Sequence, residues 1–256
     1  MESFAGKAVL ITGGASGIGF AAAQAFAAAG ADVAIADIDR QGGESAAISL
    51  SNTYFFQADL TSGSETTAMF TEAEAALGKI DILINNAGIQ FIAPIEEFPL
   101  EQWQRIMDMM VTAPFLLTRA ALPGMYQRNW GRIINVGSAH SLIASAYKSA
   151  YVTAKHGLLG LTRVTALEAA THGVTCNCVC PSYVRTPLVD KQIAAQAKTH
   201  NIPEDEVVEK IMTAESPIHR LLEPQEIADA MLYLCSQSAA GITGSAFTID
   251  CGWSAH

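Results

Sequence analysis

Three residues of this chain, Ser138, Tyr151 and Lys155, have the types and spacing needed to move a proton. Tyr151 and Lys155 are four residues apart, so a helix places them on one face, one turn from each other. Tyrosine has a reference pKa of about 10, and a positive neighbour lowers it by favouring the phenolate. Ser138 lies upstream, where a loop could return its hydroxyl to the tyrosine. Alone, a tyrosine and a lysine at this spacing are also a common pair on helix surfaces.

The elements around these residues follow a regular alternation. Seven strand-like runs alternate with helical patterns, which predicts an α/β fold: a doubly wound, seven-stranded parallel sheet, Rossmann-like, with helices on both faces. We expect one domain over residues 1–256. The polar, helical stretch from about 188 to 216 interrupts the alternation and predicts a mobile lid over the site. The strand-like runs cover residues 7–11, 32–36, 53–56, 80–84, 132–136, 175–179 and 246–249.

Composition excludes several kinds of partner. The net charge of −10 argues against nucleic acid and anionic membrane surfaces. The N-terminal residues carry no leader-like pattern, and no apolar run is long enough to span a bilayer. We therefore expect a soluble, cytoplasmic protein without a membrane or nucleic-acid partner.

The cysteines do not form a metal-binding pattern. Cys176, Cys178 and Cys180 alternate, which sends their side chains to one face of a strand without converging on an ion. Small buried side chains are the simpler interpretation. Cys235 and Cys251 are isolated. We expect no disulfide framework and no metal site.

The N-terminal part of the chain predicts a nucleotide site. The first strand-like run leads into TGGASGIG at 12–19, a helix rich in alanine, a second strand and then Asp37. Glycines in such a turn let the backbone approach a pyrophosphate, and the start of the helix attracts its charge. Asp37 could bond both ribose hydroxyls and repel a 2′-phosphate, which favours NAD over NADP. Arg40 keeps NADP open as an alternative, and Asp37 could also be an ordinary loop acid.

Together these motifs resemble the short-chain dehydrogenase/reductase family over nearly the whole chain. The shared features are TGGASGIG, Asp59, NNAG at 85–88, Ser138, the Tyr151–Lys155 pair and the turn at 181–186. The resemblance implies that Tyr151 exchanges a proton with the substrate oxygen and that Ser138 holds this oxygen. It implies that Lys155 lowers the pKa of Tyr151 and bonds the nicotinamide ribose, while hydride moves between nicotinamide and substrate.

The resemblance also implies a set of cofactor contacts and an assembly. We expect a homotetramer in which the helix over 100–128 and the helix with Tyr151 pack across one interface. The residues expected to bind NAD are Gly13, Ser16, Gly17, Ile18, Gly19, Asp37, Asp59, Leu60, Asn86, Ala87, Gly88, Tyr151, Lys155, Pro181, Val184 and Thr186.

Residues 130–189 more narrowly resemble bacterial (R)-3-hydroxybutyrate dehydrogenases. Lys148 could offer a full positive charge to a substrate carboxylate, and His140 could add a directional donor. Trp253 could wall the methyl end of the substrate. Each also has an ordinary interpretation, as a solvated lysine, a loop histidine or an oligomer contact, and Gln192 could be a surface residue of the lid. The substrate residues implied are Gln90, Ser138, His140, Lys148, Tyr151, Gln192 and Trp253.

One position departs from the family pattern. An asparagine is usual where this chain has Met110, and in the family its backbone carbonyl holds a water of a proton relay. Pro114 lacks an N–H, so a helix here would leave the Met110 carbonyl without its partner and would kink. We hypothesise that Pro114 frees this carbonyl for the water, which would make Met110 part of the catalytic group. Cys251 and Ser182 replace common glycines; Ser182 could tighten its turn, and Cys251 receives no role.

The resemblance therefore implies an NAD-dependent enzyme that interconverts (R)-3-hydroxybutyrate and acetoacetate, with a small anionic hydroxy or keto acid as substrate. A carrier-linked 3-oxoacyl reductase is less favoured, because Asp37 and the acidic surface oppose NADPH and an acidic carrier. Two alternatives are a dehydrogenase for another small hydroxy acid or ketone, and a non-catalytic NAD-binding relative disabled by Met110. The intact Ser138, Tyr151 and Lys155 oppose the second alternative.

Overall fold

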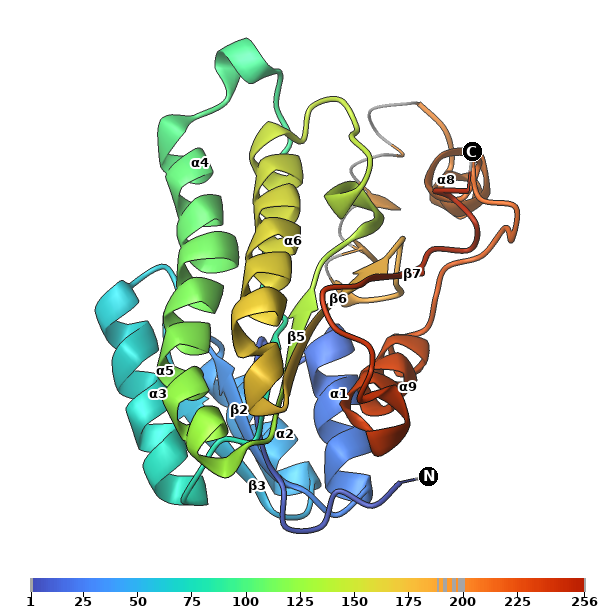
Figure 1. Cartoon of the computed structure of the whole chain (residues 1–256). Coiled ribbons are helices and arrows are strands. Elements are labelled where there is room, and N and C mark those ends of the chain that lie inside the picture. Colours follow the sequence, from blue (N-terminus) through green and yellow to red (C-terminus); the bar gives the residue numbers. More distant parts are fainter. Residues whose placement is uncertain (1, 188, 191–192, 195–196, 198–200, 256) are drawn as a thin grey trace.

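The structure is a computed structural model that describes residues 2–187, 189–190, 193–194, 197 and 201–255. Its centre is a seven-stranded sheet in the order β3-β2-β1-β4-β5-β6-β7, and every neighbouring pair is parallel (Figure 1). This confirms the predicted doubly wound α/β fold. The strands are β1 (Ala8–Thr12), β2 (Asp32–Asp37), β3 (Thr53–Gln57), β4 (Ile82–Asn85), β5 (Gly131–Val136), β6 (Val174–Pro181) and β7 (Ala246–Ile249).

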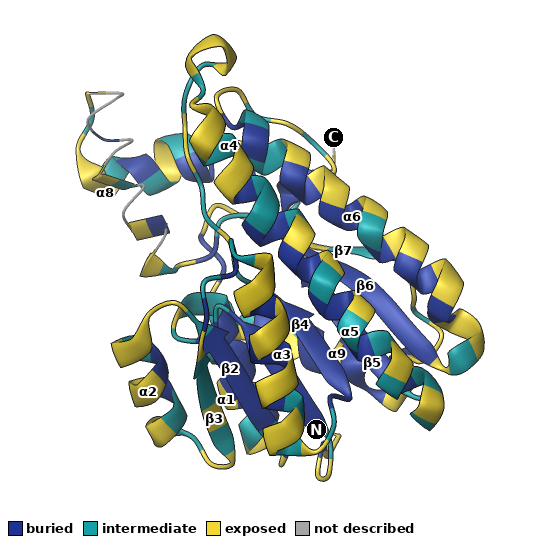
Figure 2. Ribbon diagram, turned by 90° about the vertical axis from the view of Figure 1, so that its left-hand side faces the viewer, coloured by how far each residue is buried: buried dark blue, intermediate teal, exposed yellow. Residues whose placement is uncertain are grey.

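Helices cover both faces of the sheet, and each face has its own apolar core. Figure 2 shows the central strands buried between these two layers. One layer contains α1 (Gly17–Ala28), α2 (Arg40–Ser49) and α9 (Pro224–Cys235). The other contains α3 (Gly63–Leu77), α4 (Leu100–Met107), α5 (Ala113–Arg128) and α6 (Ser149–Ala169).

The strands form because their apolar runs are buried on both faces, as a parallel sheet requires. Every residue of β1, β4, β5 and β6 is buried, whereas the edge strands β3 and β7 are partly exposed. The alternating cysteines of β6 are buried as predicted, and all five cysteines of the chain are free thiols. The described part of the segment predicted as a lid contains α8 (Glu204–Val207) and a π turn, Val208–Met212.

One helix, α2, was not expected from the sequence. Gly42 and Gly43 lie in its first turn, and glycine disfavours helix by about 1 kcal/mol relative to alanine. The Asp39 side chain compensates by accepting the Gly42 N–H at 3.1 Å, an N-cap. Gly43 is needed for packing, because a Cβ there would run into the Phe55 ring.

The long helical run from Leu100 to Arg128 is continuous but irregular. A π turn, Asp108–Thr112, joins α4 to α5, and within it the Ala113 N–H bonds the carbonyl of Asp108, five residues back. Pro114 follows directly, in the first turn of α5. The irregularity predicted at Met110 is therefore present, as a π turn rather than a simple kink.

None of the helices in the described part of the chain is both long enough and apolar enough to cross a membrane.

Candidate active site

A cleft of about 340 Å³ lies at the carboxyl ends of the strands. It sits where the strand order reverses between β1 and β4, the point at which open α/β sheets leave room for a ligand. The glycine turn after β1 and the loop after β4 line one part of it. Ser138, Tyr151 and Lys155 line another part. The fold therefore brings the predicted proton-transfer group and the predicted nucleotide turn to one cavity.

The glycine turn has the conformation that a pyrophosphate site requires. Gly13 has φ +66° and Gly17 has φ +55°, in the left-handed region that glycine adopts without strain. The Ser16 side chain does not cap α1, so the N–H groups of its first turn can meet an anion. Gly19 does not line the cleft; a Cβ there would strike the Gly13 carbonyl and the Asn86 amide. Its role is to let α1 pack under the turn.

Asp37 is tied to the glycine turn rather than free in a loop. Its two carboxylate oxygens accept the backbone N–H groups of Ala15 at 3.1 Å and Asp39 at 3.0 Å. A carboxylate has about four acceptor positions, so two remain for ribose hydroxyls. Arg40 instead bonds Glu44 at 2.8 Å on the exposed surface of α2. This arrangement leaves an acid, and not a free guanidinium, at the end of β2.

The residues predicted to bind NAD all line the cleft except Gly19 and Asp59. The Asp59 carboxylate accepts the Thr61 N–H at 2.9 Å and its hydroxyl at 2.8 Å. These bonds lower the pKa of Asp59. Its neighbours Ala58 and Leu60 line the cleft in its place.

The proton-transfer group is closely packed. Lys155 is 4% exposed, and its Nζ donates to the Val136 carbonyl at 2.6 Å, 5.5 Å from the centre of the Tyr151 ring. The Tyr151 ring is half-buried and lines the cleft together with Ser138, which interacts with its hydroxyl. Burial raises the pKa of Tyr151 to about 12 and lowers the pKa of Lys155 to about 8. The expected lowering of the Tyr151 pKa is thus wrong for the free protein, because loss of water disfavours both charged forms.

The predicted substrate residues His140, Lys148 and Trp253 gather beside Tyr151. The His140 ring meets Tyr151 and Trp253 edge-on, with ring centres 5.9 and 5.2 Å apart. Lys148 is 7% exposed and donates to the Tyr183 hydroxyl at 3.2 Å, so it is not a solvated surface lysine. Tyr183 in turn stacks on Trp253 at 6.1 Å. His140, Lys148, Tyr183 and Trp253 therefore form one wall of aromatic and cationic side chains beside Tyr151.

Comparison with known proteins agrees with this geometry. A family profile described as Enoyl-(Acyl carrier protein) reductase matches residues 13–254. A D-beta-hydroxybutyrate dehydrogenase of Rhizobium meliloti is 44% identical, over 98% of this chain and 99% of the relative. Another of that name, from Cupriavidus necator, is 43% identical over the same shares. A 2-(S)-hydroxypropyl-CoM dehydrogenase of Xanthobacter autotrophicus is 37% identical over 97% of each chain.

The chain belongs to the short-chain dehydrogenase/reductase family. It is therefore an oxidoreductase of a family that uses NAD or NADP. The glycine turn, the uncapped start of α1 and Asp37 fit such a dinucleotide.

Two predicted substrate residues are not part of the contacts just described. Gln90 is half-buried in the loop after β4, and Gln192 lies outside the described residues. Conversely, Tyr183 was not assigned a role from the sequence. The only signal was an aromatic residue within the 181–186 turn of the family pattern.

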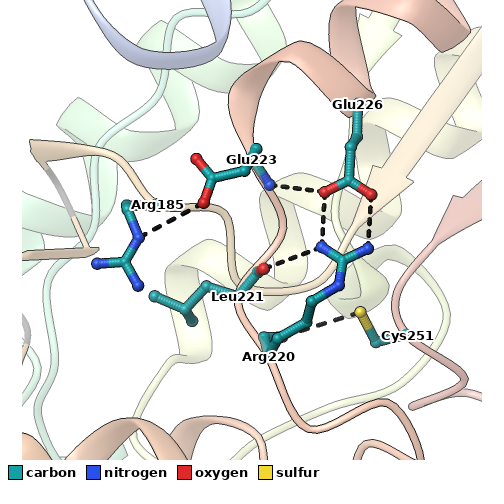
Figure 3. A network of polar contacts seen from close by, with 6 residues as sticks. All are labelled: Arg185, Arg220, Leu221, Glu223, Glu226 and Cys251. Carbon is teal, nitrogen blue, oxygen red and sulfur yellow. Dashed lines mark hydrogen bonds and ion pairs between the residues drawn. The ribbon is translucent and has the colours of Figure 1, made fainter.

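The segment that carries Trp253 is anchored by the network in Figure 3. The Arg220 guanidinium makes two bonds of 2.7 Å to Glu226 in α9, and this pairing lowers the pKa of Glu226 to about 2. The Cys251 thiol donates to the Arg220 carbonyl at 3.8 Å, and Cys251 itself has φ +57°, where glycine is usual in the family. Arg185 pairs with Glu223 at 3.6 Å. The network joins the C-terminal turn to both ends of the segment between residues 185 and 222.

Proposed function

We propose that this short-chain dehydrogenase/reductase oxidises (R)-3-hydroxybutyrate to acetoacetate with NAD and catalyses the reverse reaction. Lys148 carries the proposal. It is a buried cation three residues before Tyr151, its hydrogen-bond partner is a phenol, and none of the ion pairs among the described residues includes it. A buried charge is costly without a counterion, and a substrate carboxylate would supply one.

The other residues divide the work. Ser138 and Tyr151 would hold the substrate oxygen and exchange its proton, while Lys155 stays fixed by the Val136 carbonyl. Lys148 would hold the carboxylate, His140 would line the pocket between Tyr151 and Trp253, and Trp253 would close the pocket at the methyl end. Bound NAD supplies the hydride acceptor.

NAD rather than NADP is proposed because Asp37 lines the cleft and accepts only two N–H bonds, so its carboxylate could also accept bonds from ribose hydroxyls. A 2′-phosphate there would meet a carboxylate, while Arg40 is engaged by Glu44. The names of the two hydroxybutyrate relatives support the choice of substrate.

Lys148→Met tests the carboxylate clamp. We expect kcat/KM for (R)-3-hydroxybutyrate to fall about 100-fold, the loss of a charge-assisted hydrogen bond in a buried site. Oxidation of butan-2-ol, which has no carboxylate, should change less than about threefold. Lys148→Arg, the matched control, keeps the charge and should retain part of the activity. An equal loss on both substrates would contradict the clamp.

The same assay separates the alternatives. Wild-type protein would be offered (R)-3-hydroxybutyrate, its (S) enantiomer, lactate and butan-2-ol, with NADH formation as the readout. Preference for lactate would favour a dehydrogenase for another small hydroxy acid, and preference for butan-2-ol would remove the carboxylate argument. NADH binding without turnover of any substrate would favour the non-catalytic relative.

The homotetramer and the closing lid remain proposals. For the first, α5 and α6 leave the side chains of Phe115, Val164 and Leu167 exposed, which is compatible with the expected interface.

A further inference from the structure

Next to Tyr151 lies a row of hydrogen-bonding side chains to which the proposed function gives no proton-transfer role beyond Ser138. Ser138 lines the cleft beside Tyr151 and interacts with its hydroxyl, and its Oγ lies 3.4 Å from Nδ1 of His140. Nε2 of His140 lies 2.7 Å from the Ser145 hydroxyl. Tyr151, Ser138, His140 and Ser145 therefore form a series of neighbouring groups that can each give and accept a proton.

Ser145 brings this series to a second cavity. The cavity measures about 430 Å³. Its lining includes Ser145 and Glu215 together with Tyr183 and Trp253, which adjoin the proposed substrate site, but neither the glycine turn nor Asp37. Ser145 is half-buried, and the alanines on either side of it are exposed. The series thus leads from a buried phenol to a place where water can enter.

The state of His140 suits a bridge. Burial, together with the charges of Lys148, His156 and Lys155, lowers the pKa of His140 to about 4, so the ring is neutral near pH 7. A neutral imidazole has one donor and one acceptor nitrogen. The His140 backbone N–H already donates to Ser138 Oγ at 3.2 Å, so the serine proton is left for Nδ1. We assign the ring proton to Nε2, which donates to Ser145.

We propose that Ser138, His140 and Ser145 carry the proton released at Tyr151 into the second cavity, and that Ser145 is a positioning residue acting through His140. This rests on the oxidoreductase function proposed above. In alcohol oxidation, the substrate hydroxyl gives its proton to Tyr151. The proton that Tyr151 carried passes to Ser138 Oγ, and the Ser138 proton passes to Nδ1. The Nε2 proton passes to Ser145 Oγ, and the Ser145 proton passes to water.

Each bridging group gains one proton as it loses another, so none is left charged. After product release, exchange with water entering the substrate site returns the imidazole proton to Nε2. The route requires neither an asparagine nor the Met110 carbonyl, and it gives a proton exit to a chain in which methionine replaces the usual asparagine.

The test is the first turnover, followed as NADH formation by stopped flow in H₂O and D₂O. Ser145→Ala should slow the first turnover about tenfold and enlarge its solvent isotope effect, because water must replace a fixed hydroxyl. KM should change less than about twofold. Ser145→Thr keeps the hydroxyl and should restore most of the rate. Ser149→Ala is the matched control, since the buried Ser149 hydroxyl has no partner among the described residues.

Two results would overturn the proposal. One is an unchanged first-turnover rate and isotope effect in Ser145→Ala. The other is a raised KM with both of these unchanged, which would mean that Ser145 only orients His140 toward a carboxylate. Ser145→Gly repeats the test if the alanine variant is unstable. The comparison uses whichever alcohol the wild type oxidises, so failure of the hydroxybutyrate assignment shows up separately, in the substrate preference of the wild type.

Discussion

Burial sets the charge of the residues around Tyr151. The pKa shifts of Tyr151, Lys155 and His140 all favour the neutral form, and desolvation is the largest cause of each. Where little water is present, a charged side chain is weakly screened and interacts more strongly with other charges. Lys148 lies in the same wall and is the residue that an anionic substrate would meet.

The neutral His140 has a consequence for pH dependence. With a pKa of about 4 against a usual value of 6.5, it should not titrate between pH 5 and 8. We expect the pH profile of kcat/KM to show no inflection near 6.5. The lowered pKa also stabilises the fold above pH 6.5, and this stability should be lost as the pH falls toward 4, since the unfolded chain binds the proton first.

Comparing wild type with His140→Gln checks both expectations. The difference in Tm between the two proteins should shift in favour of the variant as the pH falls from 6.5 toward 4. An inflection near 6.5 that disappears in the variant would contradict a neutral, buried histidine.

For single residues, the motifs indicated which side chains lie near one another better than they indicated the pKa shifts of those side chains. Ser138, Tyr151, Lys155, His140 and Lys148 belong to neighbouring contacts in the structure, and their roles in binding and catalysis stay predictions. The direction of the Tyr151 shift was wrong, because a spacing places two charges together without showing how much water surrounds them. The role of Tyr183 was missed for a related reason: its contacts with Lys148 and Trp253 join distant parts of the chain.

Among the elements, the π turn before α5 contains Met110, whose carbonyl we predicted to take part in the proton relay. Pro114 has no N–H to offer the Met110 carbonyl. Pro114→Ala would restore a helical donor, so we expect the first turnover to slow about threefold while the Kd of NAD changes less than about twofold. The loss is partial because the proposed Ser145 route remains. Isothermal titration and stopped flow measure the two quantities, and an unchanged first turnover would remove Met110 from the proton path.

Element prediction succeeded where the apolar pattern was strong. The run at 246–249 coincides with β7, and the continuous apolar runs of the inner strands gave their positions to within a few residues. Helix α2 was missed because its glycines contradict helix propensity, while the Asp39 cap and the Phe55 contact that justify them are tertiary. Local sequence shows the unfavourable helix propensity of a glycine, but it does not show the tertiary contacts that compensate for it.

For the whole molecule, strand order decides where the cleft opens. Six of the seven strands, β1 to β6, either end in a residue that lines the cleft or are followed directly by one. The reversal of strand order between β1 and β4 separates the loops that follow these two strands and so leaves the space of the cleft. The alternation of strands and helices predicted this edge as the site. We propose that the choice between NAD and NADP depends on one side chain at that edge, Asp37, and on the engagement of Arg40 by Glu44.

Ligand-induced stabilisation of the whole chain tests this choice without requiring turnover. A ligand at 100 times its Kd stabilises a protein by about 2.7 kcal/mol, which raises Tm by roughly 5–10 °C for a chain of this size. We expect this shift with NADH and a much smaller one with NADPH at equal concentration, because Asp37 repels the 2′-phosphate. Asp37→Ser should narrow the difference, whereas Arg40→Ala should leave it unchanged, since Arg40 bonds Glu44. Equal shifts with both cofactors in the wild type would show that the carboxylate at the end of β2 does not select between them, and a loss of the NADPH shift in Arg40→Ala would assign the selection to Arg40.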